Sequence, residues 1–309
     1  MRHVTVLMAG IACSPILFSA LAPAQEKQAP VDSSTVELIE AGTAPLRELR
    51  FTPKPDATQT AVMTMGMNQA MSINGQKIPS QNIPETKFTI KTSVDNIAKN
   101  GEIEFSFFYS EIDIVDDPAN PSPLAATMRT SLQPMVGTAG DIVVNNRGLV
   151  QRTEIDIPDG VPAQLKQVLD GMKNSMNQLS SPLPVEPVGV GGKWRVVQTI
   201  NANGLRLKQT STHEITQLTE HGFSVDVTMT QDANPQEIKN DALPPTTKIN
   251  LTSLKSTGNA KSTIALDSVF PIRTTMTITS QTAMGIEAAG QNQDMTIDMK
   301  MELTLETLP

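Results

Sequence analysis

The sequence is almost free of cysteine. Its single cysteine, Cys13, lies in an N-terminal apolar stretch that is typical of a secretory signal. Arg2 gives this stretch a basic start, and Ala22–Ala24 forms a small-x-small cleavage site. We therefore expect residues 1–24 to be removed and the mature protein to be secreted or periplasmic. A mature chain without a thiol excludes disulfides, cysteine nucleophiles and thiolate metal sites.

An alternative concerns Cys13 itself. The stretch Gly10–Cys13 resembles the lipidation box of bacterial lipoproteins, and processing there would leave the chain lipid-anchored through Cys13. The usual Leu of that box is missing, and apolar sequence continues beyond Cys13. We therefore favour cleavage near Ala24.

Aromatic side chains and positive charge are scarce as well. Only 3% of the residues are Phe, Trp or Tyr, so the core has to be built from Met, Ile, Leu and Val. The chain has 32 acidic against 24 basic residues and contains no basic cluster. This balance argues against nucleic-acid partners and against binding to anionic membrane surfaces. No stretch after the signal is apolar enough to span a bilayer, so we expect no transmembrane segment.

Catalytic and cofactor motifs are missing from the sequence. It contains no Gly-x-Ser-x-Gly elbow and no His-Glu-x-x-His metal motif. His213 and His221 lack metal-ligand spacing to each other or to a carboxylate pair. The run Gly189–Lys193 is no phosphate loop, because prolines precede it and no Ser or Thr follows the lysine. Its glycines instead predict a close approach of two backbones. We predict a non-catalytic protein with no cofactor and no metal site.

The sequence does contain a strict alternation of apolar and polar residues. In the first segment with this alternation, four methionines lie an even number of residues apart, so they would line one face of an extended strand: Met63, Met65, Met67 and Met71. The same alternation recurs in three later segments: Phe223–Met229, Ile272–Met284 and Met295–Leu305. Strands that are apolar on one face only are typical of antiparallel sheets.

A hairpin is the clearest local prediction. Apolar residues alternate over Phe88–Val94, Lys99–Gly101 makes the turn, and the alternation returns over Ile103–Tyr109. The parity then switches at Ile112, which predicts a bulge or bend near residues 108–111.

These patterns predict a mainly β fold with one large, curved antiparallel sheet that resembles half a barrel. Residues 46–309 would form this single domain, after a flexible leader over residues 25–45. Apolar residues at helical spacing predict two helices, near residues 123–133 and 162–179. We expect both helices to pack on the concave apolar face of the sheet.

The methionine-rich face has three interpretations. It is the solid core of a structural or protein-interaction module, the lining for a lipid or other apolar ligand between sheet and helices, or a set of thioether ligands for Cu(I). Core filling is the simplest, and copper is disfavoured because alternate residues of one strand lie about 7 Å apart. The residues expected to line a ligand are Met63, Met65, Met67, Met71, Leu165, Leu169, Met172, Met176, Met276, Met299 and Met301.

Three stretches resemble a known family: Leu38–Arg50, Pro182–Trp194 and the alternating strands from Gly258 to the C-terminus. Together they are similar to an uncharacterised family of secreted bacterial envelope β-proteins, a domain of unknown function. The Pro-Val-Gly-x-Gly-x-Lys-Trp stretch is the specific part of this resemblance. No functional residues are established for that family, so none is carried over. The architecture resembles, more loosely, periplasmic lipoprotein carriers.

Overall fold

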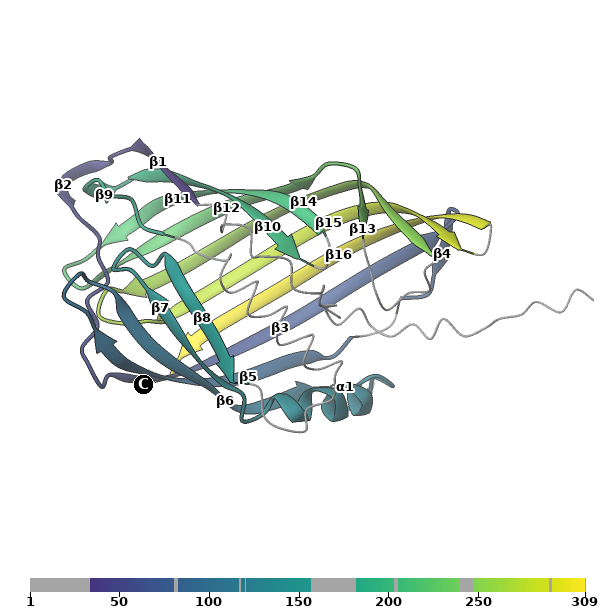
Figure 1. The fold of residues 1–309 in the computed structure, drawn as a ribbon, viewed down its shortest axis with the longest axis horizontal. Helices are drawn as coiled ribbons and strands as arrows, with labels where there is room; N and C mark the ends of the chain where they lie inside the picture. Colours follow the sequence, from purple (N-terminus) through teal and green to yellow (C-terminus); the bar gives the residue numbers. More distant parts are fainter. Residues whose placement is uncertain are drawn as a thin grey trace, which may run out of the picture.

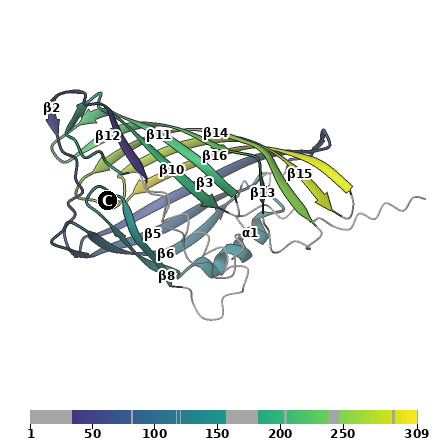
Figure 2. The ribbon, with the colours of Figure 1, turned by 45° about the horizontal axis from the view of Figure 1, so that its top comes forward.

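A computed structural model describes residues 34–80, 83–116, 118–119, 121–156, 182–202, 205–238, 247–288 and 291–308. The chain is mainly β, and its strands form one large antiparallel sheet of 14 strands (Figures 1 and 2). Twelve of these strands run from edge to edge in the order β1 (Thr35–Glu40), β10 (Lys193–Ala202), β11 (Leu205–Leu218), β12 (Gly222–Ala233), β14 (Lys248–Ala265), β15 (Arg273–Ala288), β16 (Gln291–Thr307), β3 (Thr58–Ile73), β5 (Glu85–Ile97), β6 (Ile103–Val115), β7 (Ala139–Val144) and β8 (Val150–Asp156).

Smaller elements complete the fold. β4 (Gln76–Ile78) pairs with β3, and β13 (Gln236–Ile238) pairs with β14. β2 (Thr43–Arg47) and β9 (Val188–Val190) form a separate two-stranded sheet. Gly189 lies against the backbone of Thr43, where a Cβ atom would collide with the Thr43 carbonyl. This contact confirms the close backbone approach that the glycines predict.

The two methionine strands, far apart in the sequence, are neighbours in the middle of the sheet. β16 pairs with β3 from Met295 to Thr307, and Met301 lies directly opposite Met67 (Figure 1). Because side chains alternate along each strand and every pairing is antiparallel, the register places one residue set on one side of the sheet. We call the side that carries Met67, Met301 and Trp194 the inner face.

The inner face is uncharged across the whole sheet. From β1 to β8, no Asp, Glu, Lys or Arg of the described strands has the inner-face parity, whereas the opposite parity carries pairs such as Lys261–Asp226 and Arg273–Glu306. Alternation in the sequence has therefore sorted all charge to one side.

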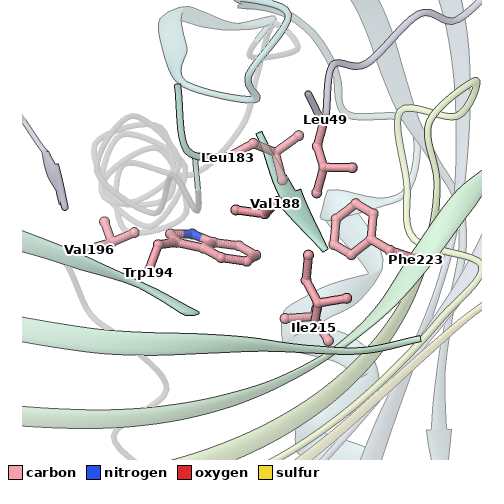
Figure 3. Packing of buried hydrophobic residues seen from close by; sticks show 8 residues of the cluster. Leu49, Leu183, Val188, Trp194, Val196, Ile215 and Phe223 are labelled. Atoms are coloured by element: carbon pink, nitrogen blue, oxygen red, sulfur yellow. The ribbon is translucent and has the colours of Figure 1, made fainter. Parts of the chain in front are cut away.

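Two clusters of buried side chains lie on the inner face. The cluster on β10–β12 includes Trp194, Val196, Ile215 and Phe223, and it also takes in residues of the loop before β9 (Figure 3). The second cluster lies on β5, β6 and β7. It consists of Ile142 on β7 and the apolar residues of the predicted hairpin: Phe88, Ile90, Val94, Ile103, Phe105, Phe107 and Tyr109. Phe51, before β3, packs against both clusters. It thereby joins the two ends of the strand order.

A proline-rich segment, residues 182–187, lies where the two ends of the strand order are joined, a region that we call the junction. Side-chain hydrogen bonds hold the segment there. Four consecutive carbonyls accept side-chain hydrogen bonds: Trp194 Nε1 donates to Pro182 O at 3.2 Å, Arg147 Nε to Leu183 O at 2.7 Å, and the Arg50 guanidinium to Pro184 O at 3.1 Å and Val185 O at 2.8 Å. We call this segment the strap. Prolines remove backbone donors and keep a strand ladder from forming, so the carbonyls need other partners.

The predicted bulge is confirmed. Thr89 pairs with Glu111 while the next residue, Ile90, pairs with Tyr109, so Ser110 is the extra residue in β6. The Ser110 hydroxyl donates to the Thr89 carbonyl at 3.2 Å, which fixes the bulge. This explains why the apolar parity of the strand switches there.

The helices differ from the expectation. One α-helix, α1 (Ala125–Leu132), lies in the described part of the chain at the place of the predicted helix near 123–133, followed by the short 3-10 turn η1 (Gln133–Met135). Ser122 accepts a hydrogen bond from Leu124 N at 3.2 Å before α1 starts. Ala125 and Met128 pack against Ile114 at the end of β6.

The arrangement of two helices on the concave face of a half-barrel is therefore not supported. A helix of this length buries only two residues, so α1 covers one strand end rather than a sheet face. The sheet is open, with β1 and β8 as its edges. Residues 162–179, predicted as the second helix, lie outside the described residues. None of the described helices is long and apolar enough to cross a membrane.

The prediction of a flexible leader over residues 25–45 is wrong for residues 35–45, which contain β1 and the start of β2. β1 pairs with β10 and β2 pairs with β9, so this stretch is built into both sheets. Its polar composition misled the sequence interpretation, because an edge strand has one exposed side and tolerates polar residues. Residues 25–33 lie outside the described residues.

The strap yields a stability prediction. Arg50→Ala removes the donors for the Pro184 and Val185 carbonyls and should lower the free energy of unfolding by about 1–2 kcal/mol. Arg273→Ala, which removes an exposed ion pair with Glu306, should lower it by about 0.5 kcal/mol or less. Urea unfolding of the two variants measures the difference. Equal stability of both would contradict a structural role for the strap.

Candidate ligand-binding face

The structure brings together the described methionines that the sequence singled out. Met63, Met65, Met67 and Met71 lie on β3, Met276 on β15, and Met299 and Met301 on β16, all with the inner-face parity and all half-buried. These three strands are adjacent in the sheet. The other four candidates, Leu165, Leu169, Met172 and Met176, lie outside the described residues.

The methionines fall into two groups. Met63 and Met65 pack against the buried cluster on β5–β7, so they extend a solid core. Met67, Met71, Met276, Met299 and Met301 are not part of the clusters described above. We call these five residues the methionine zone. Its side chains lie on long strands that continue past both clusters, so it is the part of the inner face suited to a ligand.

Sulfur atoms come closer across strands than along one strand. Met67 faces Met301, and Met295 faces Met284, as directly opposed residues. Directly opposed residues have Cβ atoms roughly 5 Å apart, against about 7 Å for alternate residues of one strand. The sequence could not reveal these pairs, because the register between the first long strand and the last is set by the whole sheet.

The structure also reveals a polar row that sequence reasoning missed. Cα pairing aligns six uncharged polar residues across the inner face, interrupted only at β16 by Met299: Gln198, Gln209, Gln231, Ser256, Ser280 and Gln69. We call this set the amide row. Gln231 Nε2 donates to Gln209 Oε1 at 2.7 Å, and Ser34 Oγ donates to Gln198 Oε1 at 3.3 Å. In β10 and β12 the available signal was a glutamine among residues whose parity is otherwise apolar.

His213 is a buried neutral base beside this row. Its ring stacks on Trp194 with centroids 4.9 Å apart, and its Nε2 lies 3.0 Å from the Ser211 hydroxyl. Burial lowers the pKa of His213 to about 4. His213 is therefore part of the core and not a solvated residue, with only 4% of its surface exposed.

The chemistry available on the inner face is therefore contact and neutral hydrogen bonding. Within the described ranges, no group of three His, Cys, Asp or Glu side chains could hold a metal ion. Two surface hollows lie elsewhere. One of about 320 Å³ includes Glu104 and Arg152 on the outer parity of β6 and β8, and one of about 410 Å³ lies within the β3–β4 turn. Neither overlaps the methionine zone.

Comparisons with known proteins add little on function. A family of unknown function, DUF6263, matches residues 160–270, which include the strap and the Pro182–Trp194 stretch. This match supports the resemblance to an uncharacterised family. No curated protein matches the chain. A mutant of the Rh. blastica porin is similar over 81% of this chain and 100% of that chain, with 7% identity and a TM-score of 0.17, which is too low to support an argument.

The burial of His213 predicts a pH dependence of stability. In the unfolded chain the imidazole takes up a proton below about pH 6.5, whereas the folded protein resists protonation down to about pH 4. Stability should therefore fall by roughly 3 kcal/mol from this residue as the pH drops from 7 to 4, and this contribution levels off at lower pH.

Urea unfolding at several pH values measures this effect. His213→Phe should flatten the acid side of the stability profile relative to the wild type, and His221→Gln, at an exposed turn, should leave the profile unchanged. The same acid loss in wild type and His213→Phe would show that His213 is not buried as described.

Proposed function

We propose that this protein is a non-catalytic binding protein that holds a lipid or another apolar ligand on the methionine zone of the inner face. The observation that carries the proposal is the half-buried set of methionines on three adjacent strands of an uncharged face. A ligand there would cover apolar surface without desolvating a charge.

The energetics support such an occupant. Burying a methionine side chain fully contributes about 1.5–3 kcal/mol, so covering the remaining surface of five half-buried methionines contributes on the order of 5 kcal/mol. Methionine is unbranched and polarizable, so its side chains adapt to ligands of irregular shape. The looser resemblance to periplasmic lipoprotein carriers is compatible with a ligand of this kind.

We also propose that the protein works outside the cytoplasm. The basic start at Arg2, the apolar stretch and the cleavage site at Ala22–Ala24 support export. Mass spectrometry of the mature N-terminus tests this: a chain that begins at Gln25 supports it, and a chain that retains residues 1–24 contradicts it. A diacylated Cys13 would instead indicate the lipid-anchored alternative.

Two observations support the other two interpretations, which are copper binding and a protein-interaction module. The opposed pair Met67 and Met301 supports Cu(I) binding by thioethers. Leu46, Val185 and Val190 are exposed apolar side chains on and beside the β2–β9 sheet, which supports a protein partner at that end. Binding of a ligand to the methionine zone requires neither feature.

A charge placed on the inner face tests ligand binding. Met67→Glu should weaken binding of the fluorophore N-phenyl-1-naphthylamine at least tenfold, because a carboxylate would have to be buried beside the ligand. Asn68→Glu places the same charge on the exposed opposite side of β3 and should change the affinity less than twofold. Fluorescence titration measures both. Thermal unfolding checks that Met67→Glu remains folded.

A conservative variant separates the ligand from copper. Met67→Leu keeps the apolar surface and should retain the fluorophore affinity, while it removes one thioether. If Met67→Leu abolishes Cu(I) uptake in a competition titration and the wild type does not bind the fluorophore, copper binding replaces the proposal. Lipid extracted from protein purified from its native compartment gives an independent test.

A further inference from the structure

The amide row divides the inner face into three bands. On the side toward Trp194, the neighbouring row contains Met67, Met301 and Ile278. On the other side, the neighbouring row contains Met71 and Ile297. Hydrocarbon therefore lies on both sides of a band of neutral hydrogen-bonding groups.

We propose that the amide row recognises the carbonyl of a neutral acyl ester whose hydrocarbon lies on the flanking methionines. This inference rests on the proposed function, because it names the chemical class of the apolar ligand. The carbonyl of an ester is an acceptor without charge, and the amide and hydroxyl groups of the row are donors.

The absence of charge on the inner face selects against ionic ligands. A fatty-acid carboxylate would lose its hydration without gaining a Lys or Arg partner on the described part of the face, which is strongly unfavourable. An ester carbonyl loses far less hydration, and one hydrogen bond from the row compensates for it.

Ser256 marks the point of recognition. Its side chain is 4% exposed, and its Oγ atom is buried without a hydrogen-bond partner. Buried polar groups are nearly always hydrogen-bonded, so this hydroxyl, like those of Thr92, Thr138 and Thr153, is a donor without an acceptor in the described part of the free protein, and it is the one of the four that lies in the amide row. Ser256 lies between Gln231 and Ser280, which are only half-buried, so this is where the row becomes accessible.

The neighbours of Ser256 can make room for a ligand. Gly258, two residues along the same face, has no side chain, and a Cβ atom there would lie 2.8 Å from Met229 Cε and 3.2 Å from Ile278 Cγ1. The flexible Met229 side chain thus occupies the space over Gly258, in the row next to Ser256. Its rotation would open a path to the hydroxyl.

Displacement of N-phenyl-1-naphthylamine by monoolein and by oleate at pH 8 tests the inference. Both ligands have the same acyl chain, and monoolein should bind at least tenfold more tightly than oleate. Ser256→Ala should weaken monoolein about tenfold, the equivalent of one hydrogen bond of roughly 1.4 kcal/mol, and leave oleate within twofold.

The matched control is Thr257→Ala, which removes an exposed hydroxyl from the opposite side of β14 and should change neither affinity. A second readout separates recognition from structure. Ser256→Ala removes a buried hydroxyl without a partner, so it should leave the stability of the free protein equal or higher in urea unfolding.

The outcomes are distinguishable. If neither the fluorophore nor either lipid binds, the proposed function fails and the inference with it. If the fluorophore binds but monoolein and oleate compete equally, or Ser256→Ala leaves monoolein unaffected, the amide row has no part in recognition and the proposed function stands alone. Tighter binding of oleate than of monoolein overturns the inference as well.

Discussion

The fold depends on the side-chain hydrogen bonds that hold the strap in place. Residues 182–185 present four carbonyls in succession, and these accept hydrogen bonds from side chains in three parts of the fold: Trp194 on β10, Arg147 in the β7–β8 turn, and Arg50 before β3, which bonds two of the carbonyls. Because β10 lies near one edge of the strand order and the β7–β8 turn lies at the other, these bonds connect regions that the strand ladder does not.

The electrostatics of this junction are determined by two guanidinium groups that lie close together. Arg147 and Arg50 converge on neighbouring carbonyls, and burial together with the charge of Arg50 lowers the pKa of Arg147, an effect that Glu186 partly opposes. Two guanidinium groups are tolerated here because carbonyl oxygens, each with two lone pairs, surround them. The junction fixes one end of the sheet, and the long strands β14, β15, β16 and β3 extend away from it (Figure 2).

Much of this arrangement is encoded locally, and the rest is not. Alternation in Met63–Met71 and in Met295–Leu305 predicts one-sided strands, and the parity switch before Ile112 predicts the bulge at Ser110. The pairing of β16 with β3 is different, because it joins residues more than 200 positions apart and depends on every strand between them. The edge position of β1 was also hidden, since the alternation of Val36 and Leu38 is too short to distinguish an edge strand from a leader.

The sequence predicts the methionines of the candidate face but not its amide row, and both results have the same cause. Sequence patterns separate two faces, but they do not show which residues of one face lie side by side in different strands. Gln198 and Gln231 look like isolated exceptions along the chain, and only the register makes them neighbours of Gln209, which lies between them.

The register of the strands also argues against the interpretation that the inner face is only a solid core. A core needs only apolar groups at these positions, and leaving a buried hydroxyl such as that of Ser256 without a partner costs about 1–3 kcal/mol relative to a satisfied one. Alanine there would avoid this loss and would fit the same backbone. A row of neutral donors between two largely apolar bands therefore supports the proposed ligand, which would contact both bands and the row together.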